Sequence, residues 1–284
     1  MMKKTIIDFN KTEIKKMNYI NWLKKETSLL SVDGKTIEVY SLNCDLNNDT
    51  IMSEWATHFR NQYCDDAEID LLKPKNQSRK DFLNQIKFPD PSNAPGPSIR
   101  SGDFGEIVIS DFLEFLENYW VPRTRYNRKD IQNESSKGSD VLGFKFASTH
   151  SFSADDELCI FEVKAGYSNT KDKYDRLQDA VIGSQKDEKR KAESLNAIKQ
   201  RFIDLRQLNE ANKIERFQDP EDNPCIQEYG AAALFDENNF LPTRIISVDC
   251  TEHSNNDILR LIVISVKEMK TLINNLYKRA ADEA

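Results

Sequence analysis

The 284-residue sequence lacks the signatures of several common protein classes. Its five cysteines form no CxxC pair and no zinc-type array with the three histidines, so we expect reduced thiols and no structural zinc. No apolar run approaches the length of a membrane span, and the apolar stretch at residues 5–7 is far too short for a signal peptide. The sequence therefore predicts a cytoplasmic protein with no membrane partner.

The sequence also lacks the motifs of nucleotide-binding proteins and of enzymes that use a serine or cysteine nucleophile. There is no Walker or dinucleotide-binding glycine loop, which leaves ATP hydrolysis without support, and no Ser-His-Asp or Cys-His arrangement. An excess of positive charge is also absent, because 40 Lys and Arg against 47 Asp and Glu give a net charge of −7. That balance argues against a protein that coats nucleic acid broadly.

The most informative segment that is present is an apolar run, Leu-Cys-Ile-Phe at residues 158–161, followed by Glu162-Val163-Lys164. Such a run is typical of a strand buried on both faces. Alternation then places Glu162 and Lys164 on one face, about 6.5–7 Å apart at their Cβ atoms. Burying either charge alone is costly, so each needs a compensating partner, which could be a metal, a phosphate or the other member of the pair. A plain salt bridge at the end of a strand is the alternative.

A second strand is predicted just upstream by the alternating sequence at residues 141–146, which Asp140 opens. The serine-rich linker that follows is too short for a helical crossover, so the two strands should form an antiparallel hairpin with a long loop. If Phe146 pairs near Glu157, Asp140 falls opposite Val163. Its carboxylate would then lie within reach of both charges at the end of the later strand.

A third acidic residue, Glu106, stands in a segment with helical spacing of apolar residues from Phe104 to Tyr119. Asp103, with Glu106 three residues later, fits a capping box. That role would place Glu106 at the start of the helix for a structural reason. A role in a site is the other interpretation, and the two can coexist.

The order along the chain is a helix with Glu106, a strand opened by Asp140, a strand closed by the Glu-x-Lys motif, and a helix from about residue 172. This order resembles the core of the PD-(D/E)xK nuclease superfamily. The resemblance implies an α/β, restriction-endonuclease-like fold with a mixed sheet flanked by helices. Ser139 stands where the superfamily's name has proline, at a position that varies among such nucleases.

The resemblance also implies a chemistry. Asp140, Glu162 and the backbone carbonyl of Val163 would hold Mg²⁺, with Mn²⁺ as a substitute, Lys164 would position the attacking water, and Glu106 would assist through a second metal or a water. Mg²⁺ prefers carboxylate, water and phosphate oxygens, and it lowers the pKa of its bound water. An ammonium group supplies positive charge where the pentacovalent phosphate becomes negative.

Longer stretches are similar to the HamA family of bacterial Hachiman anti-phage systems. They are WxxHFRNQYC at 55–64, KFPD at 87–90 and PGPSIRSGDFGE at 95–106, and the resemblance covers about residues 50–166. It implies a nuclease effector that works with HamB, a superfamily 2 helicase. It further implies that the complex restrains the nuclease until phage infection or DNA damage.

A basic segment between the Glu106 helix and Asp140 is the predicted DNA-binding surface. Its cations are Arg123, Arg125, Arg128, Lys129 and Lys137. Such a segment would give an acidic chain a local grip on phosphates. The alternative is that these side chains only solvate a loop or an edge strand.

Prolines between residues 89 and 97 mark an extended connector that divides the chain. Residues 1–90 would form an N-terminal α/β extension, either a packing element or a docking surface for the helicase. Residues 91–284 would form the PD-(D/E)xK nuclease domain.

Other patterns predict strands at 36–43, 230–235, 244–248 and 259–266, and helices at 52–63 and 268–279. An apolar stripe from Leu195 to Leu208 predicts one long helix, whose charged entry at 187–191 should be solvent-exposed.

The sequence thus predicts a Mg²⁺-dependent deoxyribonuclease. Two alternatives stay open: a non-catalytic, partner-binding subunit that keeps the scaffold, and an RNase, because the metal chemistry is indifferent to the sugar.

Overall fold

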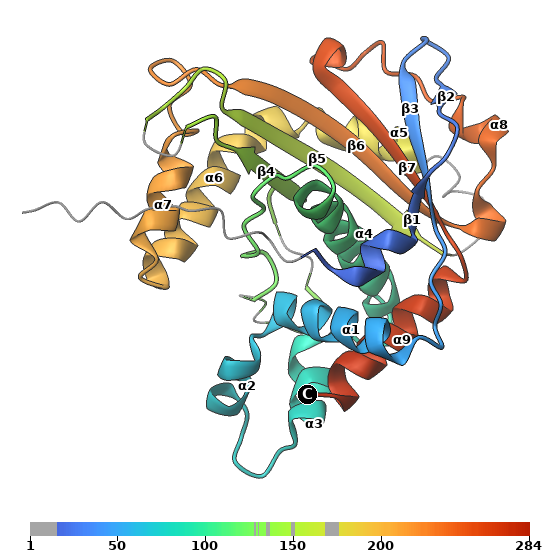
Figure 1. The fold of residues 1–284 in the computed structure, drawn as a ribbon, viewed down its shortest axis with the longest axis vertical. Helices are drawn as coiled ribbons and strands as arrows, with labels where there is room; N and C mark the ends of the chain where they lie inside the picture. The colour runs from blue at the N-terminus through green and yellow to red at the C-terminus, as the bar shows by residue number, and fades with distance from the viewer. Residues whose placement is uncertain (1–15, 128, 130, 135–136, 149–150, 168–175) are drawn as a thin grey trace, which may run out of the picture.

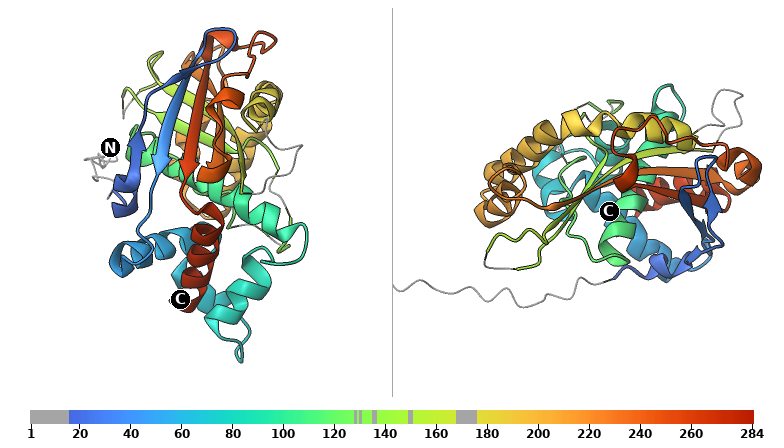
Figure 2. Two further views of the ribbon diagram at one scale, coloured as in Figure 1. Left: turned by 90° about the vertical axis from the view of Figure 1, so that its right-hand side faces the viewer. Right: turned by 90° about the horizontal axis from the view of Figure 1, so that it is seen from above.

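The computed structural model describes residues 16–127, 129, 131–134, 137–148, 151–167 and 176–284. Within these residues, seven strands form one curled, mixed sheet with helices on both faces (Figures 1 and 2). The strands are β1 (Leu23–Lys25), β2 (Leu29–Leu30), β3 (Thr36–Leu42), β4 (Val141–Lys145), β5 (Glu157–Gly166), β6 (Ile226–Asp236) and β7 (Leu259–Val266). The α-helices are α1 (Asp49–Tyr63), α2 (Asp66–Leu72), α3 (Arg79–Phe82), α4 (Gly96–Phe115), α5 (Arg176–Ser184), α6 (Asp187–Asp204), α7 (Leu208–Glu215), α8 (Pro242–Ile245) and α9 (Met269–Asp282). Short 3₁₀ helices cover Asn18–Trp22, Glu237–Asn239 and Asn256–Ile258, and a π-helical turn covers Leu83–Lys87.

The sheet runs in the order β1-β3-β7-β6-β5-β4, and β2 also pairs with β3. The central strands β3, β7, β6 and β5 are parallel, whereas the outer pairs are antiparallel. Parallel strands are usually covered by helices on both faces. In β6, Ala232 and Leu234 pack into the core that contains α1, α4 and α9, and Ala231 and Ala233 pack into the opposite core with α5, α6, α7 and α8.

Strands β4 and β5 form the predicted antiparallel hairpin, but the predicted register is wrong by one residue. The ladder ends before Phe146, so Glu157 pairs with the preceding residue. Asp140 is consequently level with Glu162 and not with Val163. Phe146 follows the end of β4, and its ring packs against those of Trp120 and Phe217.

Helix α4 begins at Gly96, well before the capping box that we predicted. A proline occupies its first turn, where the missing backbone N–H is not needed. Asp103 and Glu106 therefore lie inside the helix, and the capping interpretation is wrong. Gly105 lets this helix pack closely on the sheet, since a Cβ at this position would lie 2.6 Å from the Cβ of Ala165 in β5. This close packing brings Glu106 to the surface of the sheet.

The described part of the N-terminal region, residues 16–90, shares the sheet and the core with the remainder of the chain. Strand β3 pairs in parallel with β7, and helix α1 packs against α9, where the ring centroids of Phe59 and Tyr277 are 4.9 Å apart. The predicted division at residue 90 therefore cuts through one sheet and one core. Strand β3 and helix α1 agree with the elements predicted at 36–43 and 52–63.

Toward the C-terminus, β6, β7 and α9 agree with the predicted elements, but residues 244–248 are not a strand. Helix α8 and a turn occupy this segment. The helix begins at Pro242, and proline is favoured in the first turn of a helix. The predicted long helix is divided into α6 and α7 at Arg206, which has a left-handed φ of 58°.

All five cysteines are free, in agreement with the prediction of reduced thiols. Cys159 lies in the core, also as predicted. Among the described residues, no helix combines the length and the apolar character needed to cross a lipid bilayer.

Candidate active site

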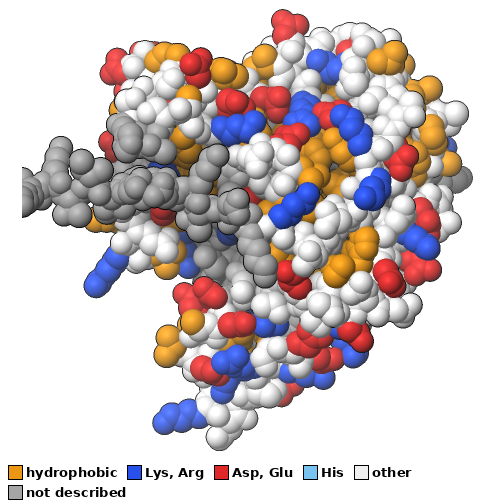
Figure 3. All heavy atoms as spheres, in the orientation of Figure 1, with side chains coloured by type: hydrophobic (Ala, Val, Ile, Leu, Met, Phe, Trp, Pro, Cys, Tyr) orange, Lys and Arg blue, Asp and Glu red, His pale blue; other side chains and the backbone are white. Residues whose placement is uncertain are grey.

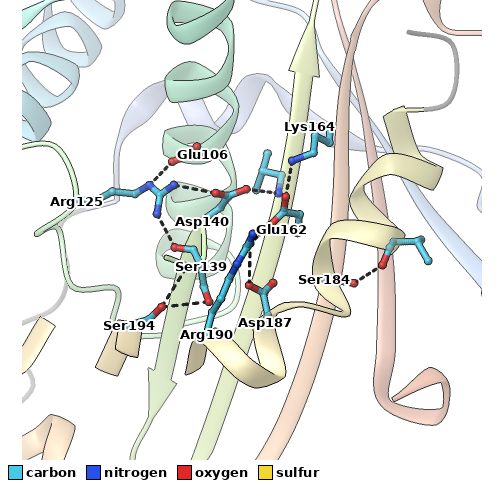
Figure 4. A network of polar contacts seen from close by, with 12 residues as sticks. Glu106, Arg125, Ser139, Asp140, Glu162, Lys164, Ser184, Asp187, Arg190 and Ser194 are labelled. Carbon is cyan, nitrogen blue, oxygen red and sulfur yellow. Dashed lines mark hydrogen bonds and ion pairs between the residues drawn. The ribbon is translucent and has the colours of Figure 1, made fainter. Parts of the chain in front are cut away.

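Asp140, Glu162 and Lys164 meet at the base of the β4–β5 hairpin (Figure 4). Strand alternation puts Glu162 and Lys164 on one face of β5, where their side chains form an ion pair. Asp140 stands immediately before β4, and its Oδ2 accepts a hydrogen bond of 2.9 Å from the backbone N–H of Val163. The hairpin thus holds the two carboxylates and the ammonium group in one small region.

Glu106 joins this region from helix α4 through Arg125. The guanidinium of Arg125 lies 2.6 Å from Glu106 Oε2 through Nε and donates to Asp140 Oδ1 at 2.8 Å through Nη2. Its Nη1 donates to the carbonyl of Ser139 at 2.6 Å. The hydroxyl of Tyr126 donates to the same oxygen of Glu106. One arginine therefore fixes the helix carboxylate and the strand carboxylate relative to each other.

A fourth acid in the region, Asp187, was not predicted. It opens helix α6 and is fully buried, whereas we expected residues 187–191 to form a solvent-exposed charged run. Arg190, one turn later, lies 3.9 Å from Asp187 Oδ1 and 3.5 Å from Glu162 Oε2 through the same Nη1 atom. The sequence contained only a weak signal for this residue, an aspartate at a helix start, because its burial depends on where the fold places α6 relative to Glu162 in β5.

Burial and repulsion between neighbouring charges raise the pKa values of Glu106, Glu162 and Asp187. The pKa of Glu106 is raised to about 8, mainly because burial disfavours its charged form, with Arg125 opposing the shift and Asp140 adding to it. The pKa of Glu162 is raised by burial and by repulsion from Asp140. Burial and repulsion from Glu162 raise the pKa of Asp187 to about 7. An additional cation would stabilise a cluster of this kind.

These oxygen donors suit a hard divalent cation that takes only a few of its ligands directly from the protein. Mg²⁺ typically takes one or two protein carboxylates and completes its octahedron with waters and substrate phosphates. Asp140 and Glu162 supply two carboxylates, and the buried oxygens of Asp187, which accept no hydrogen bond of good geometry, leave the cluster with unused capacity for positive charge. In the part of the chain that the structure describes, no group of three His, Cys, Asp or Glu side chains is arranged to hold an ion directly.

The basic segment predicted to bind DNA is largely occupied by contacts inside the protein. Arg123 pairs with Asp111 at 2.6 Å and also with Glu114. Lys129 is buried and donates to Asp103 at 2.9 Å. Because these two cations neutralise internal carboxylates, we do not keep the prediction that they contact DNA.

The remaining basic residues differ in position. Arg125 belongs to the carboxylate cluster, Lys137 is exposed, and Arg128 lies outside the described residues. Between α4, the segment after it and α6 lies a cleft of about 510 Å³, whose lining includes Arg125, Lys137, Asp140 and Arg201. The carboxylate of Asp140 thus shares one cleft with several basic side chains.

The position of Glu162 also depends on a glycine in α5. A Cβ on Gly183 would lie 2.5 Å from Glu162 Oε1, so Gly183→Ala should displace this carboxylate. If the cluster hydrolyses nucleic acid, as the sequence predicts, we expect the rate to fall by about 10- to 100-fold, because a small misplacement of a reacting group is costly. The free energy of unfolding should change by less than about 1 kcal/mol, since alanine favours the helix.

A matched control for this variant is Gly102→Ala in α4, where a Cβ would meet no atom within 4 Å. Rates measured on the two purified variants, with urea unfolding of each, test the prediction. Equal activity of Gly183→Ala and the unmodified chain would contradict it.

Comparison with known proteins adds one match. A model of the HamA family matches residues 17–280 of the chain. The match extends beyond the motifs at residues 50–166 and includes β3, β7 and most of α9. No curated protein matches the chain.

Proposed function

The chain belongs to the HamA family, a membership that suggests a role in Hachiman anti-phage defence, and from this premise we propose that it is the metal-dependent deoxyribonuclease of such a system. The observation that carries the proposal is the convergence of Asp140, Glu162 and Lys164 beside Glu106. These side chains come from three segments of the chain, whereas a plain salt bridge between Glu162 and Lys164 would involve β5 alone. We further propose that the chain acts with a superfamily 2 helicase similar to HamB.

The order of the elements supports a PD-(D/E)xK core within the sheet. Helix α4 carries Glu106. Trp120, in the segment that follows this helix, forms an isolated antiparallel bridge with Phe144 of the β4–β5 hairpin. Helices α5, α6 and α7 then lead to β6, which lies parallel to β5. Both strands of the hairpin bring their acidic residues to the same place, as that core requires.

In the proposed reaction, Asp140, Glu162 and the carbonyl of Val163 would hold Mg²⁺ or Mn²⁺. When bound, such a cation supplies an acidified water and neutralises charge on the phosphate. The ammonium of Lys164, held beside Glu162, orients the attacking water and stabilises negative charge on the pentacovalent phosphate. Glu106 positions Arg125 and assists through a second metal or a water.

Cleavage assays on the purified full-length chain test this function. Labelled DNA and RNA would be incubated over a Mg²⁺ titration, with and without the helicase, and with EDTA as the control. We expect DNA cleavage that requires Mg²⁺ or Mn²⁺. Cleavage of RNA alone would replace the proposal by an RNase, and no cleavage under any condition would favour the non-catalytic subunit.

The charge of the chain predicts how it binds DNA. On the face seen in Figure 3, acidic and basic side chains are interspersed without a large field of one sign. With a net charge of −7, the isolated chain should bind duplex DNA weakly, and its helicase complex should bind much more tightly. Fluorescence anisotropy at several salt concentrations would measure both affinities.

The same assay tests the cleft. Lys137→Ala should reduce the slope of log affinity against log salt by about 0.9, the value of one phosphate contact on duplex DNA. Lys278→Ala, in α9, is the control, because this lysine pairs with Asp282 outside the cleft lining. An unchanged slope for Lys137→Ala would mean that DNA does not enter by this route.

A further inference from the structure

The mechanism above leaves Asp187 without a role. This residue opens helix α6 beside the carboxylates of the hairpin, and Figure 4 shows its side chain directed toward Arg190 and Glu162. An acidic residue in the first turn of a helix has a general structural explanation, because the helix dipole favours negative charge there. Two features of Asp187 go beyond that explanation.

The first feature is that its charge is buried and its oxygens are unsatisfied. The side chain of Asp187 is fully buried, yet neither carboxylate oxygen accepts a hydrogen bond of good geometry from a described residue. Two donors lie nearby: the Ser139 side chain, which lowers the pKa of Asp187, and Arg190, 3.9 Å from Oδ1. The helix dipole contributes about 0.3–1 kcal/mol, whereas burying a carboxylate without good partners costs several kcal/mol. A carboxylate kept in this state indicates that it serves a group other than the helix itself.

The second feature is the position of the nearby cation. A single guanidinium nitrogen of Arg190 lies within 4 Å of both Asp187 and Glu162, so the two acids border a shared space that accepts positive charge. The side chain of Arg190 is 36% exposed, and it can turn toward solvent without leaving a buried cation behind. Gly183 in α5 lies directly against Glu162, because a Cβ there would be 2.5 Å from Oε1.

We propose that Asp187 is an outer-sphere ligand of the metal centre, which accepts hydrogen bonds from waters on the divalent cation held by Asp140 and Glu162. Direct coordination by three side chains is not available in the described residues, whereas Mg²⁺ normally keeps several of its waters. Partners in this outer layer orient the directly bound groups and strengthen metal binding. Asp187 is thus a positioning residue, and its assignment rests on the proposed nuclease function.

The test is a comparison of three variants of the full-length chain. Mg²⁺ and Mn²⁺ binding would be measured by calorimetry, and the melting temperature would be recorded with and without metal. Asp187→Asn should weaken metal affinity by about 10- to 100-fold. The rise in melting temperature that metal produces should shrink accordingly. Without metal, Asp187→Asn should melt at the same temperature as the unmodified chain or higher, because it removes a buried charge.

Glu188→Gln is the matched control. Glu188 lies in the same first turn of α6, but it is exposed and accepts a hydrogen bond from Asn255. A role in the helix dipole would affect both variants alike, whereas the proposal predicts normal metal affinity for Glu188→Gln. A lower metal-free melting temperature for Asp187→Asn, with unchanged metal affinity, would assign Asp187 to the helix and overturn the proposal. If Asp187→Asn does not fold, Asp187→Ala removes the same charge, and the same criteria apply to it.

Glu162→Gln separates this proposal from the proposed function. If metal binding is lost in Glu162→Gln and unchanged in Asp187→Asn, the metal centre stands and only the assignment of Asp187 fails. If the unmodified chain binds neither metal, the metal centre itself fails. Weakened binding in Asp187→Asn together with loss in Glu162→Gln supports both.

Discussion

Replacing Glu162 by glutamine should reduce the rate of DNA hydrolysis by about 10²–10³-fold or more, and Lys164→Ala should have a comparable effect. Removing a single electrostatic group that acts on the transition state typically has this cost. Glu162→Gln removes a proposed metal ligand with little change of shape. Lys164→Ala removes the ammonium that Glu162 holds in place. The measurement is single-turnover cleavage of labelled DNA at saturating Mg²⁺.

Folding and a control on the same strand make this prediction specific. Glu157→Gln changes an acid at the start of β5 that pairs with Lys145, away from the cluster, and should leave the rate unchanged. Circular dichroism would show whether each variant keeps its secondary structure. Near-normal rates in either Glu162→Gln or Lys164→Ala would remove that residue from the mechanism. Unfolding of both would instead indicate that the pair is a buried structural salt bridge.

The second large effect concerns stability and its dependence on metal. Arg125→Met should lower the free energy of unfolding by about 3–5 kcal/mol, because it leaves Glu106 and Asp140 as buried carboxylates without their shared cation. All three side chains are less than 20% exposed, so solvent screens the loss only in part. Urea unfolding without metal would measure this change. Added Mg²⁺ should restore part of the stability, since a bound cation neutralises the same carboxylates.

Arg123→Met provides the comparison, because Arg123 also neutralises two carboxylates, Asp111 and Glu114. This variant should lose a similar amount of stability, but Mg²⁺ should not restore it. The proposed metal centre does not include those acids. Equal responses of the two variants to Mg²⁺ would show that the cation acts nonspecifically and not at Asp140.

The sequence by itself determined those features that depend on local backbone geometry. Side chains alternate along any strand, so the placement of Glu162 and Lys164 on one face followed from their spacing. The short linker allowed only a hairpin between β4 and β5, and this brought Asp140 close to both of them. The family motifs likewise lie within the 17–280 match.

Only the tertiary structure decided which charges are buried and what they contact. Asp187 is adjacent to a run of charged residues, yet it is buried near Glu162 of β5, to which Arg190 links it. Arg123 and Lys129 resembled a DNA-binding segment, but carboxylates on α4 hold them inside the protein. The hairpin register also differs by one residue from the predicted one, because alternation alone does not fix where a long loop ends the pairing. A local pattern specifies which way a side chain points, whereas its partners are set by elements that meet only when the chain folds.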